Sequence, residues 1–225
     1  MGAFNIFIEV QNLLNPAELA EVRRLAAEAT FVDGRITNPH NTTKNNTQID
    51  YADSAFQKSS KILGDALFRC EEFRNFSLFR RVAPPLLCRY ASTMAYGVHS
   101  DAPFIPMQPT PLRSDVSCTI FISDPQTYDG GALTIHLGSK PVEIKGAAGS
   151  AVIYPSTTLH EVAPVTRGER LVAITFIESM ISDERKRNLL YTLNEVSALE
   201  GFNISPENRM RLEHVRNCLN RMWSS

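Results

Sequence analysis

Four side chains of the types that bind metal ions and carboxylates lie between residues 99 and 170. His99 and Asp101 are separated by one residue, and His160 follows 59 residues after Asp101. Two neutral imidazoles and one carboxylate can cover one triangular face of Fe(II) and leave the opposite face open to other ligands. Arg170, ten residues after His160, offers a fixed fork of donors for a carboxylate. Together these residues predict an iron centre that works with a dicarboxylic acid.

Each of these residues also has an ordinary structural interpretation when it is considered alone. Most isolated His-x-Asp sequences and single histidines are solvated or structural, and a motif match needs structural context. Zinc also binds three ligands of these types. Arg170 could instead pair with an acid nearby in the sequence, such as Glu169 or Glu178. We favour the iron and dicarboxylate interpretation because one strand–turn–strand unit after His160 would return Arg170 beside the metal.

Strands must carry these residues, because alternate residues of a strand share one face and Asp101 then points the same way as His99. From Leu86 onward, about seven or eight short apolar or alternating runs are separated by turns, with no helical pattern between them. Strands are expected at residues 86–90, 95–99, 117–123, 132–137, 142–145, 151–155 and 170–178. Residues 132–137 are expected to pair back on 117–123 as a hairpin across an Asp-Gly-Gly turn. The pattern predicts an antiparallel sandwich or barrel, and a double-stranded jelly roll fits it.

Helices flank this strand-rich centre, so the fold class is mainly β with flanking helices (α+β). A short strand at residues 4–10 precedes a helix at 16–29, which Asn15 caps and Pro16 opens. A second helix is expected at 53–69, and both helices pack outside one sheet. We divide the chain into an N-terminal helical layer (1–84), a jelly-roll core (85–180) and a small helical C-terminal appendage (181–225).

Three further segments, all outside the predicted helices, are candidates for loops or for the border of the site. Residues 38–48 are rich in Asn, Thr and Pro and predict a solvated loop, whereas a pocket wall around Lys44 is the alternative. The loop 102–112 contains four prolines and is expected to border the entrance of the site. Arg113 and Asp115 are expected to form a structural ion pair, and a place at the substrate mouth is the alternative.

The C-terminal appendage predicts two amphipathic helices. The first begins near Asp183 with acids before bases, the order that a helix dipole favours, and Leu189, Leu190 and Leu193 form its buried face. The second spans residues 207–223. Packing against the body of the protein is the simplest account of their apolar residues, and a homodimer surface is the alternative.

The composition argues against several classes of protein and partner. The 225 residues carry 23 basic and 24 acidic side chains, and a net charge of −1 does not indicate a nucleic-acid partner. No apolar run approaches the roughly 18 residues needed to span a bilayer, and the N-terminus lacks a signal-peptide pattern, so no membrane association is expected. The four cysteines lack CxxC spacing and predict free thiols in the cytoplasm.

Further motifs accompany the four central residues over most of the chain. They are found at residues 31–35, 44–46, 89–90, 96–101, 113–115, 123–131, 154–156 and 164–168. As a set, they resemble the iron- and 2-oxoglutarate-dependent dioxygenases, and in particular the bacterial PKHD-type hydroxylases, relatives of the prolyl 4-hydroxylases. Prolyl hydroxylases proper have Lys at the position of Arg170, so this chain departs from that branch and fits the PKHD-type branch.

The resemblance implies a jelly-roll core in which His99, Asp101 and His160 bind iron and Arg170 anchors 2-oxoglutarate. It implies a dioxygenase that uses Fe(II), 2-oxoglutarate and O2 to hydroxylate a small molecule or a peptidyl group, with succinate and CO2 as the other products. L-Ascorbate is a further candidate cofactor.

Three more residues are candidate hydrogen-bond partners of the cosubstrate, namely Tyr90, Tyr96 and Thr119. A position in the core explains each of them equally well. The alternative function is a non-catalytic jelly-roll protein whose pocket holds zinc or a small ligand without responding to 2-oxoglutarate. A metal enzyme of the cupin type is disfavoured, because cupins usually recruit more histidines and this chain has five in all.

Overall fold

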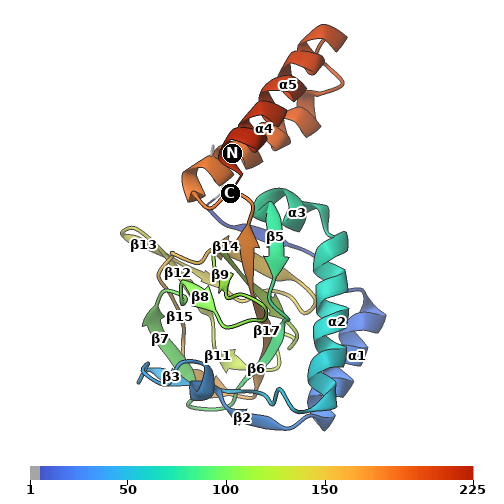
Figure 1. Ribbon diagram of the computed structural model, residues 1–225. Coiled ribbons are helices and arrows are strands. Elements are labelled where there is room, and N and C mark those ends of the chain that lie inside the picture. Colours follow the sequence, from blue (N-terminus) through green and yellow to red (C-terminus); the bar gives the residue numbers. More distant parts are fainter. Residues whose placement is uncertain (1–5, 225) are drawn as a thin grey trace.

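Two large antiparallel sheets form the centre of the computed structural model, which describes residues 6–224 (Figure 1). The larger sheet has eight strands, in the order β1 (Ile8–Val10), β14 (Ala151–Pro155), β10 (Val116–Phe121), β17 (Arg170–Ser179), β6 (Leu86–Tyr90), β4 (Thr47–Ile49) and β2 (Phe31–Asp33), with β5 (Phe79–Val82) paired to β17. The smaller sheet has five strands, in the order β13 (Lys140–Ile144), β12 (Leu133–Leu137), β15 (His160–Val162), β7 (Ala95–His99) and β3 (Lys44–Asn45).

Two short strand pairs complete the sheets and lie in the connections between them. They are β11 (Asp129–Gly130) with β16 (Val165–Arg167), and β8 (Phe104–Ile105) with β9 (Leu112–Arg113). From β6 to β17 no helix intervenes, which confirms the predicted strand-rich centre and the α+β class. The predicted strand at 4–10 is present as β1, and its first two residues lie outside the described residues.

One predicted strand pairing was wrong. Residues 132–137 were expected to return on 117–123 as a hairpin, but β12 pairs with β13 and β15 in the smaller sheet. The strand β10 instead pairs with β14 and β17, both far along the chain. The segment between β10 and β12 is too long for a tight hairpin turn and crosses from one sheet to the other.

Helix α1 (Pro16–Glu28) begins at the capping residue that the sequence indicated, and helix α2 (Ser54–Arg69) lies within its predicted bounds. Helix α1 is preceded by Asn15, whose side chain accepts from the N–H of Glu18 while Glu18 accepts from the N–H of Asn15. Helix α2 is capped by Asp53, and α3 (Glu71–Ser77) follows it directly. A short 3-10 helix, η1 (Gly34–Thr37), lies between β2 and β3.

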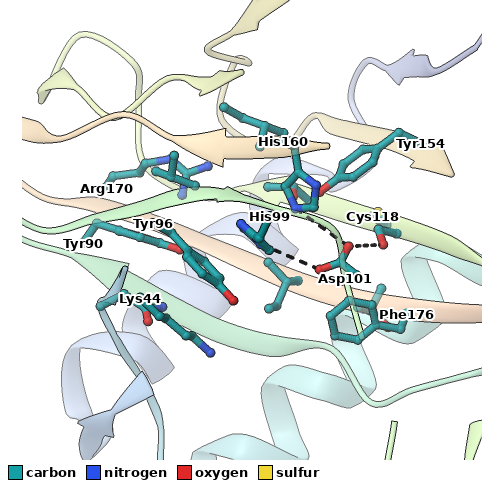
Figure 2. Close-up of a pocket in the computed structure, with 17 residues that line it drawn as sticks. Lys44, Tyr90, Tyr96, His99, Asp101, Cys118, Tyr154, His160, Arg170 and Phe176 are labelled. Carbon is teal, nitrogen blue, oxygen red and sulfur yellow. Dashed lines mark hydrogen bonds and ion pairs between the residues drawn. The ribbon is translucent and has the colours of Figure 1, made fainter. Parts of the chain in front are cut away.

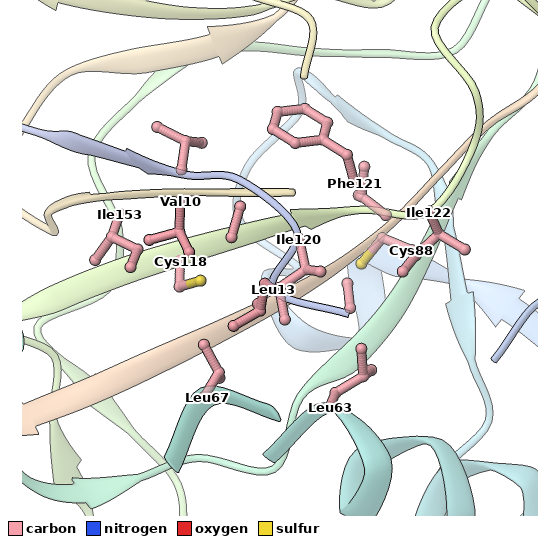
Figure 3. Close-up of a cluster of buried hydrophobic side chains, with 14 of the residues drawn as sticks. Val10, Leu13, Leu63, Leu67, Cys88, Cys118, Ile120, Phe121, Ile122 and Ile153 are labelled. Carbon is pink, nitrogen blue, oxygen red and sulfur yellow. The ribbon is translucent and has the colours of Figure 1, made fainter. Parts of the chain in front are cut away.

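These helices cover one face of the larger sheet, as predicted (Figure 1). Figure 3 shows Leu63 and Leu67 of α2 facing Cys118 and Ile120 of β10, and all four side chains are at most 1% exposed. Full burial of such an apolar side chain contributes roughly 1.5–3 kcal/mol each. The helices therefore pack against one face of β10 and its neighbour β17, and the opposite face of these strands is available to form a site.

The C-terminal appendage is a helical hairpin of α4 (Glu184–Glu200) and α5 (Pro206–Trp223) that extends away from the sheets (Figure 1). Helix α4 begins beside Asp183, as predicted, and the Asp183 side chain caps it. Leu189 was expected to be buried, but it is 49% exposed, and the buried residues of α4 are Arg187, Leu190 and Tyr191. Because successive residues of a helix are rotated by about 100°, Leu189 lies on the opposite side of α4 from these three buried residues. Within residues 6–224, no helix is long and apolar enough to cross a membrane.

Candidate active site

Strand pairing brings the three predicted metal ligands together. His99 is the last residue of β7, His160 is the first residue of β15, and the two residues are direct partners in the antiparallel pair of these strands. Asp101 was expected on the same strand as His99, but β7 ends at His99 and Asp101 lies just beyond it. The N–H of Asp101 donates to the carbonyl of Ser156, which turns the carboxyl group back toward the histidines.

The three side chains converge closely enough to share one ion (Figure 2). Nε2 of His99 lies 4.0 Å from Oδ1 of Asp101, and Nε2 of His160 lies 3.8 Å from Oδ2. One nitrogen or oxygen atom from each residue lies within 4.8 Å of the others. The donor set is two nitrogens and one oxygen without a thiolate, and this set fits Fe(II).

The main chain holds both imidazoles in the orientation that metal binding requires. Nδ1 of His99 lies 2.7 Å from the carbonyl of Gly97, and Nδ1 of His160 lies 2.9 Å from the carbonyl of Thr158. Because each Nδ1 donates its proton to a carbonyl, the Nε2 lone pairs face the cluster. Burial, together with the nearby His160, lowers the pKa of His99 to about 4. His99 is therefore neutral at neutral pH, the state that binds a metal.

Arg170 lies in the same pocket and has no acid to neutralise it among the described residues. It opens β17 opposite Tyr90 of β6, is 1% exposed, and holds its guanidinium 5.1 Å from the Tyr90 ring. Its Nε has no hydrogen-bond partner. The alternative pairing with a neighbouring acid is wrong, because Glu169 pairs with Arg89 and Glu178 with Arg81.

The three candidate cosubstrate contacts all line this pocket. Tyr90 and Thr119 are nearly fully buried on the larger sheet, and Tyr96 lies on β7 with its ring stacked on His99 at 3.6 Å between centroids. Asn38 donates to the Tyr96 hydroxyl at 3.1 Å. Burial raises the pKa of both tyrosines, so both hydroxyls keep their protons at neutral pH and can donate to a ligand.

Lys44 lines the pocket, so the alternative interpretation of residues 38–48 applies here and the favoured solvated loop was wrong. It was placed in a solvated loop, but its side chain is 7% exposed, lines the pocket and lies 5.6 Å from the Tyr96 ring. Its Nζ donates to Thr37 at 2.7 Å, and burial lowers its pKa. Asn46 lines the same wall. A single cation within a run of Asn and Thr was the available signal, but only the pairing of β3 with β7 turns it inward.

Two other predicted features lie where the sequence suggested. Arg113 and Asp115 form an ion pair at 2.8 Å and do not line the pocket, which confirms the structural interpretation. Ile105 and Met107 of the proline-rich loop line a second cavity. This cavity shares Ile174 and Phe176 with the metal-ligand pocket, so the loop borders the approach to the site.

Known proteins are similar to this chain in both sequence and fold. A family model described as the 2OG-Fe(II) oxygenase superfamily matches residues 85–178. A PKHD-type hydroxylase of Sphingopyxis alaskensis is 54% identical over 211 residues, which cover 94% of this chain and 96% of that protein. A PKHD-type hydroxylase of Thioalkalivibrio sulfidiphilus is 40% identical over 222 residues, which cover 97% and 99% of the two chains.

Solved structures confirm the jelly-roll fold. A prolyl-4-hydroxylase of Pseudomonas putida superposes with a TM-score of 0.55 at 20% identity, covering 77% of this chain and 92% of that one. A prolyl hydroxylase of Trichoplax adhaerens, solved with a peptide fragment, gives 0.56 at 17% identity and covers 83% and 87%. From its sequence relatives, this chain belongs to the PKHD-type hydroxylases and is an iron(II)- and 2-oxoglutarate-dependent oxygenase.

Proposed function

We propose that His99, Asp101 and His160 bind the iron and that Arg170 binds the far carboxylate of 2-oxoglutarate. The observation that carries this assignment is the convergence in one pocket of His99, Asp101 and His160 with a buried arginine that pairs with no acid among the described residues. A buried guanidinium without a counter-charge is costly, and a carboxylate from a ligand would supply that charge. Its planar fork matches a carboxylate with two parallel hydrogen bonds.

The protein's own residues prepare the pocket for this ligand. When bound, Fe(II) supplies the oxidative chemistry that couples 2-oxoglutarate decarboxylation to hydroxylation. Arg170 fixes the distance between the far carboxylate and the ligand cluster, and Tyr90 lies under the guanidinium. We assign Tyr96 and Thr119 as hydrogen-bond donors along the cosubstrate. The apolar walls formed by residues such as Leu133 and Val162 exclude water from the reacting groups.

The assignment is tested by spectroscopy and by product analysis. Under anaerobic conditions, addition of 2-oxoglutarate to Fe(II)-loaded protein should produce a visible absorption band, and air should then yield succinate. His99→Ala and Asp101→Ala should abolish both signals. A protein that binds Fe(II) but shows no spectral response to 2-oxoglutarate would contradict the assignment and support the alternative of a non-catalytic binding protein.

We infer that the substrate is a small molecule or a peptidyl group that enters beside the loop 102–112. The support is the cavity of about 340 Å³ next to the metal-ligand pocket. Its lining contains no charged side chain and includes Tyr51, Phe56 and Met107. A screen of metabolites and short peptides for stimulation of 2-oxoglutarate turnover would identify the substrate. Addition of L-ascorbate in the same assay would test whether it sustains repeated turnover.

Three further proposals concern the whole chain. We propose that a second copy covers the apolar residues of the helical hairpin, because Phe202 is 89% and Met222 is 74% exposed. Light scattering of the purified protein and of a Phe202→Ser variant would test for this homodimer.

We retain the division of the chain at residues 84 and 180, which limited proteolysis would test. We also place the protein in the cytoplasm, since all four cysteines are free thiols.

A further inference from the structure

Asp101 is held by a row of three buried serines. Ser117 donates to Oδ2 of Asp101 at 2.5 Å, and the hydroxyl oxygens of Ser117 and Ser156 lie 2.7 Å apart. Ser114 donates to Ser156 at 2.8 Å. The exposed fractions of Ser114, Ser117 and Ser156 are 8%, 2% and 3%, so bulk water does not replace these hydrogen bonds.

The direction of every hydrogen bond in this row follows from the carboxylate. An ionised carboxylate only accepts, and a serine hydroxyl has one proton to donate. Ser117 gives its proton to Asp101, so it accepts from Ser156, and Ser156 in turn accepts from Ser114. All three hydroxyls therefore point toward Asp101, and each donor strengthens the next through polarisation.

The row also connects the segments that carry two of the three proposed ligands. Ser117 lies on β10 of the larger sheet, and Ser156 lies in the turn four residues before His160. The carbonyl of Ser156 accepts from the N–H of Asp101 at 3.2 Å. Asp101 is thus fixed through both its main chain and its side chain to the turn that leads into His160.

We propose that Ser117 is a positioning residue of the metal centre, where it occupies one oxygen of Asp101 so that a bound metal takes a single carboxylate oxygen. If both oxygens bound the metal, the carboxylate would occupy one of the positions that the open face offers to other ligands. One oxygen from Asp101 with two imidazole nitrogens leaves that face free for a chelating ligand and O2. Ser156 and Ser114 hold Ser117 in this orientation. The inference rests on the proposed function for the identity of the metal ligands.

The test is metal binding by the metal-free protein, with Co²⁺ as the probe and no 2-oxoglutarate present. Ser117→Ala should weaken Co²⁺ binding by roughly 10–100-fold, the effect usual for a residue that orients a ligand. Ser150→Ala is the matched control, because Ser150 is 3% exposed and donates to the carbonyl of Ala147 in a turn that does not line the pocket. This control should retain wild-type affinity, and an equal loss in both variants would overturn the proposal.

Two further variants keep the test decisive if Ser117→Ala does not fold. Ser117→Thr keeps the hydroxyl and should bind Co²⁺ like the wild-type protein, whereas Ser156→Ala leaves Ser117 without its donor and should bind Co²⁺ more weakly than the wild type. The visible spectrum of bound Co²⁺ depends on the number of ligands, so it should change in Ser117→Ala and recover in Ser117→Thr. Wild-type affinity and an unchanged spectrum in both alanine variants would overturn the proposal.

The result can be separated from the proposed function. Wild-type protein that binds Co²⁺ but not 2-oxoglutarate would contradict the function while the comparison between serine variants still decides the role of Ser117. Wild-type protein that binds both, together with unchanged metal affinity in Ser117→Ala, would reject the serine proposal and leave the function intact.

Discussion

His160 lies directly opposite His99 in the pairing of β15 with β7, and their ring centroids are 4.3 Å apart. The main chain sets this relationship, so removal of either side chain leaves the strand pairing in place. We therefore expect His160→Ala to fold like the wild-type protein but to bind Fe(II) or Co²⁺ at least about 100-fold more weakly, a larger loss than an outer residue causes.

Titration calorimetry and thermal unfolding of the metal-free protein would measure these two properties. His136→Ala is the control, because His136 lies on the neighbouring strand β12 and pairs with Glu161 at 3.3 Å outside the pocket. Equal metal affinity in the His136 and His160 variants would contradict the ligand assignment.

Arg170 should contribute more to the binding of 2-oxoglutarate than to the stability of the folded protein. Arg170→Met removes a buried cation that has no acid partner among the described residues, so the unfolding temperature of the ligand-free protein should not fall. The affinity for 2-oxoglutarate should fall by roughly 10–150-fold, the loss expected for charge-assisted hydrogen bonds worth about 1.5–3 kcal/mol. 2-Oxobutyrate, which lacks the far carboxylate, should bind the variant and the wild type equally. An equal loss for both keto acids would show that Arg170 does not hold the far carboxylate.

Gly131 leaves the space beside its backbone that the side chain of Arg170 occupies. Its φ is +63°, and an added Cβ would lie 2.9 Å from Val165 and 3.1 Å from Cδ of Arg170. Gly131→Ala should therefore destabilise the protein and also weaken 2-oxoglutarate binding while metal affinity is retained. Gly138 has nearly the same φ, +62°, with open space around it. Gly138→Ala should show only the backbone strain of about 1–2 kcal/mol, measured by urea unfolding. Identical ligand binding in the two variants would reject this role for Gly131.

The metal-free protein should lose stability in mild acid because of His99. The pKa of His99 is about 4 in the folded protein and 6.5 in the reference state, so the unfolded chain takes up a proton first as the pH falls. Above about pH 6.5 the titration of His99 therefore does not affect stability. As the pH falls from about 6.5 toward 4, this titration progressively lowers the free energy of unfolding. Urea unfolding at pH 7.5 and pH 5 would measure the loss, which should be smaller in His99→Gln. An equal loss in the variant would assign the acid sensitivity to other groups.

Local sequence signals predicted the elements of this fold well. Asn15 caps α1 and helix α4 begins beside Asp183, both as expected, since a helix start depends on residues only a few positions away. Strand β7 and strand β17 begin where the alternating apolar pattern begins. The pairing of β12 could not be obtained in the same way, because the choice between two sheets depends on packing partners distant in sequence.

By itself the sequence determined the metal-binding residue types, their spacing and the strands of His99 and Arg170, because these depend on composition and short-range periodicity. Only the tertiary structure decided that Arg170 is left without an acid, that Lys44 turns into the pocket, and that Ser117 holds Asp101. Each of these depends on which strands lie side by side and how deeply they are buried. Such relationships follow from the packing of the whole chain, so no local pattern encodes them.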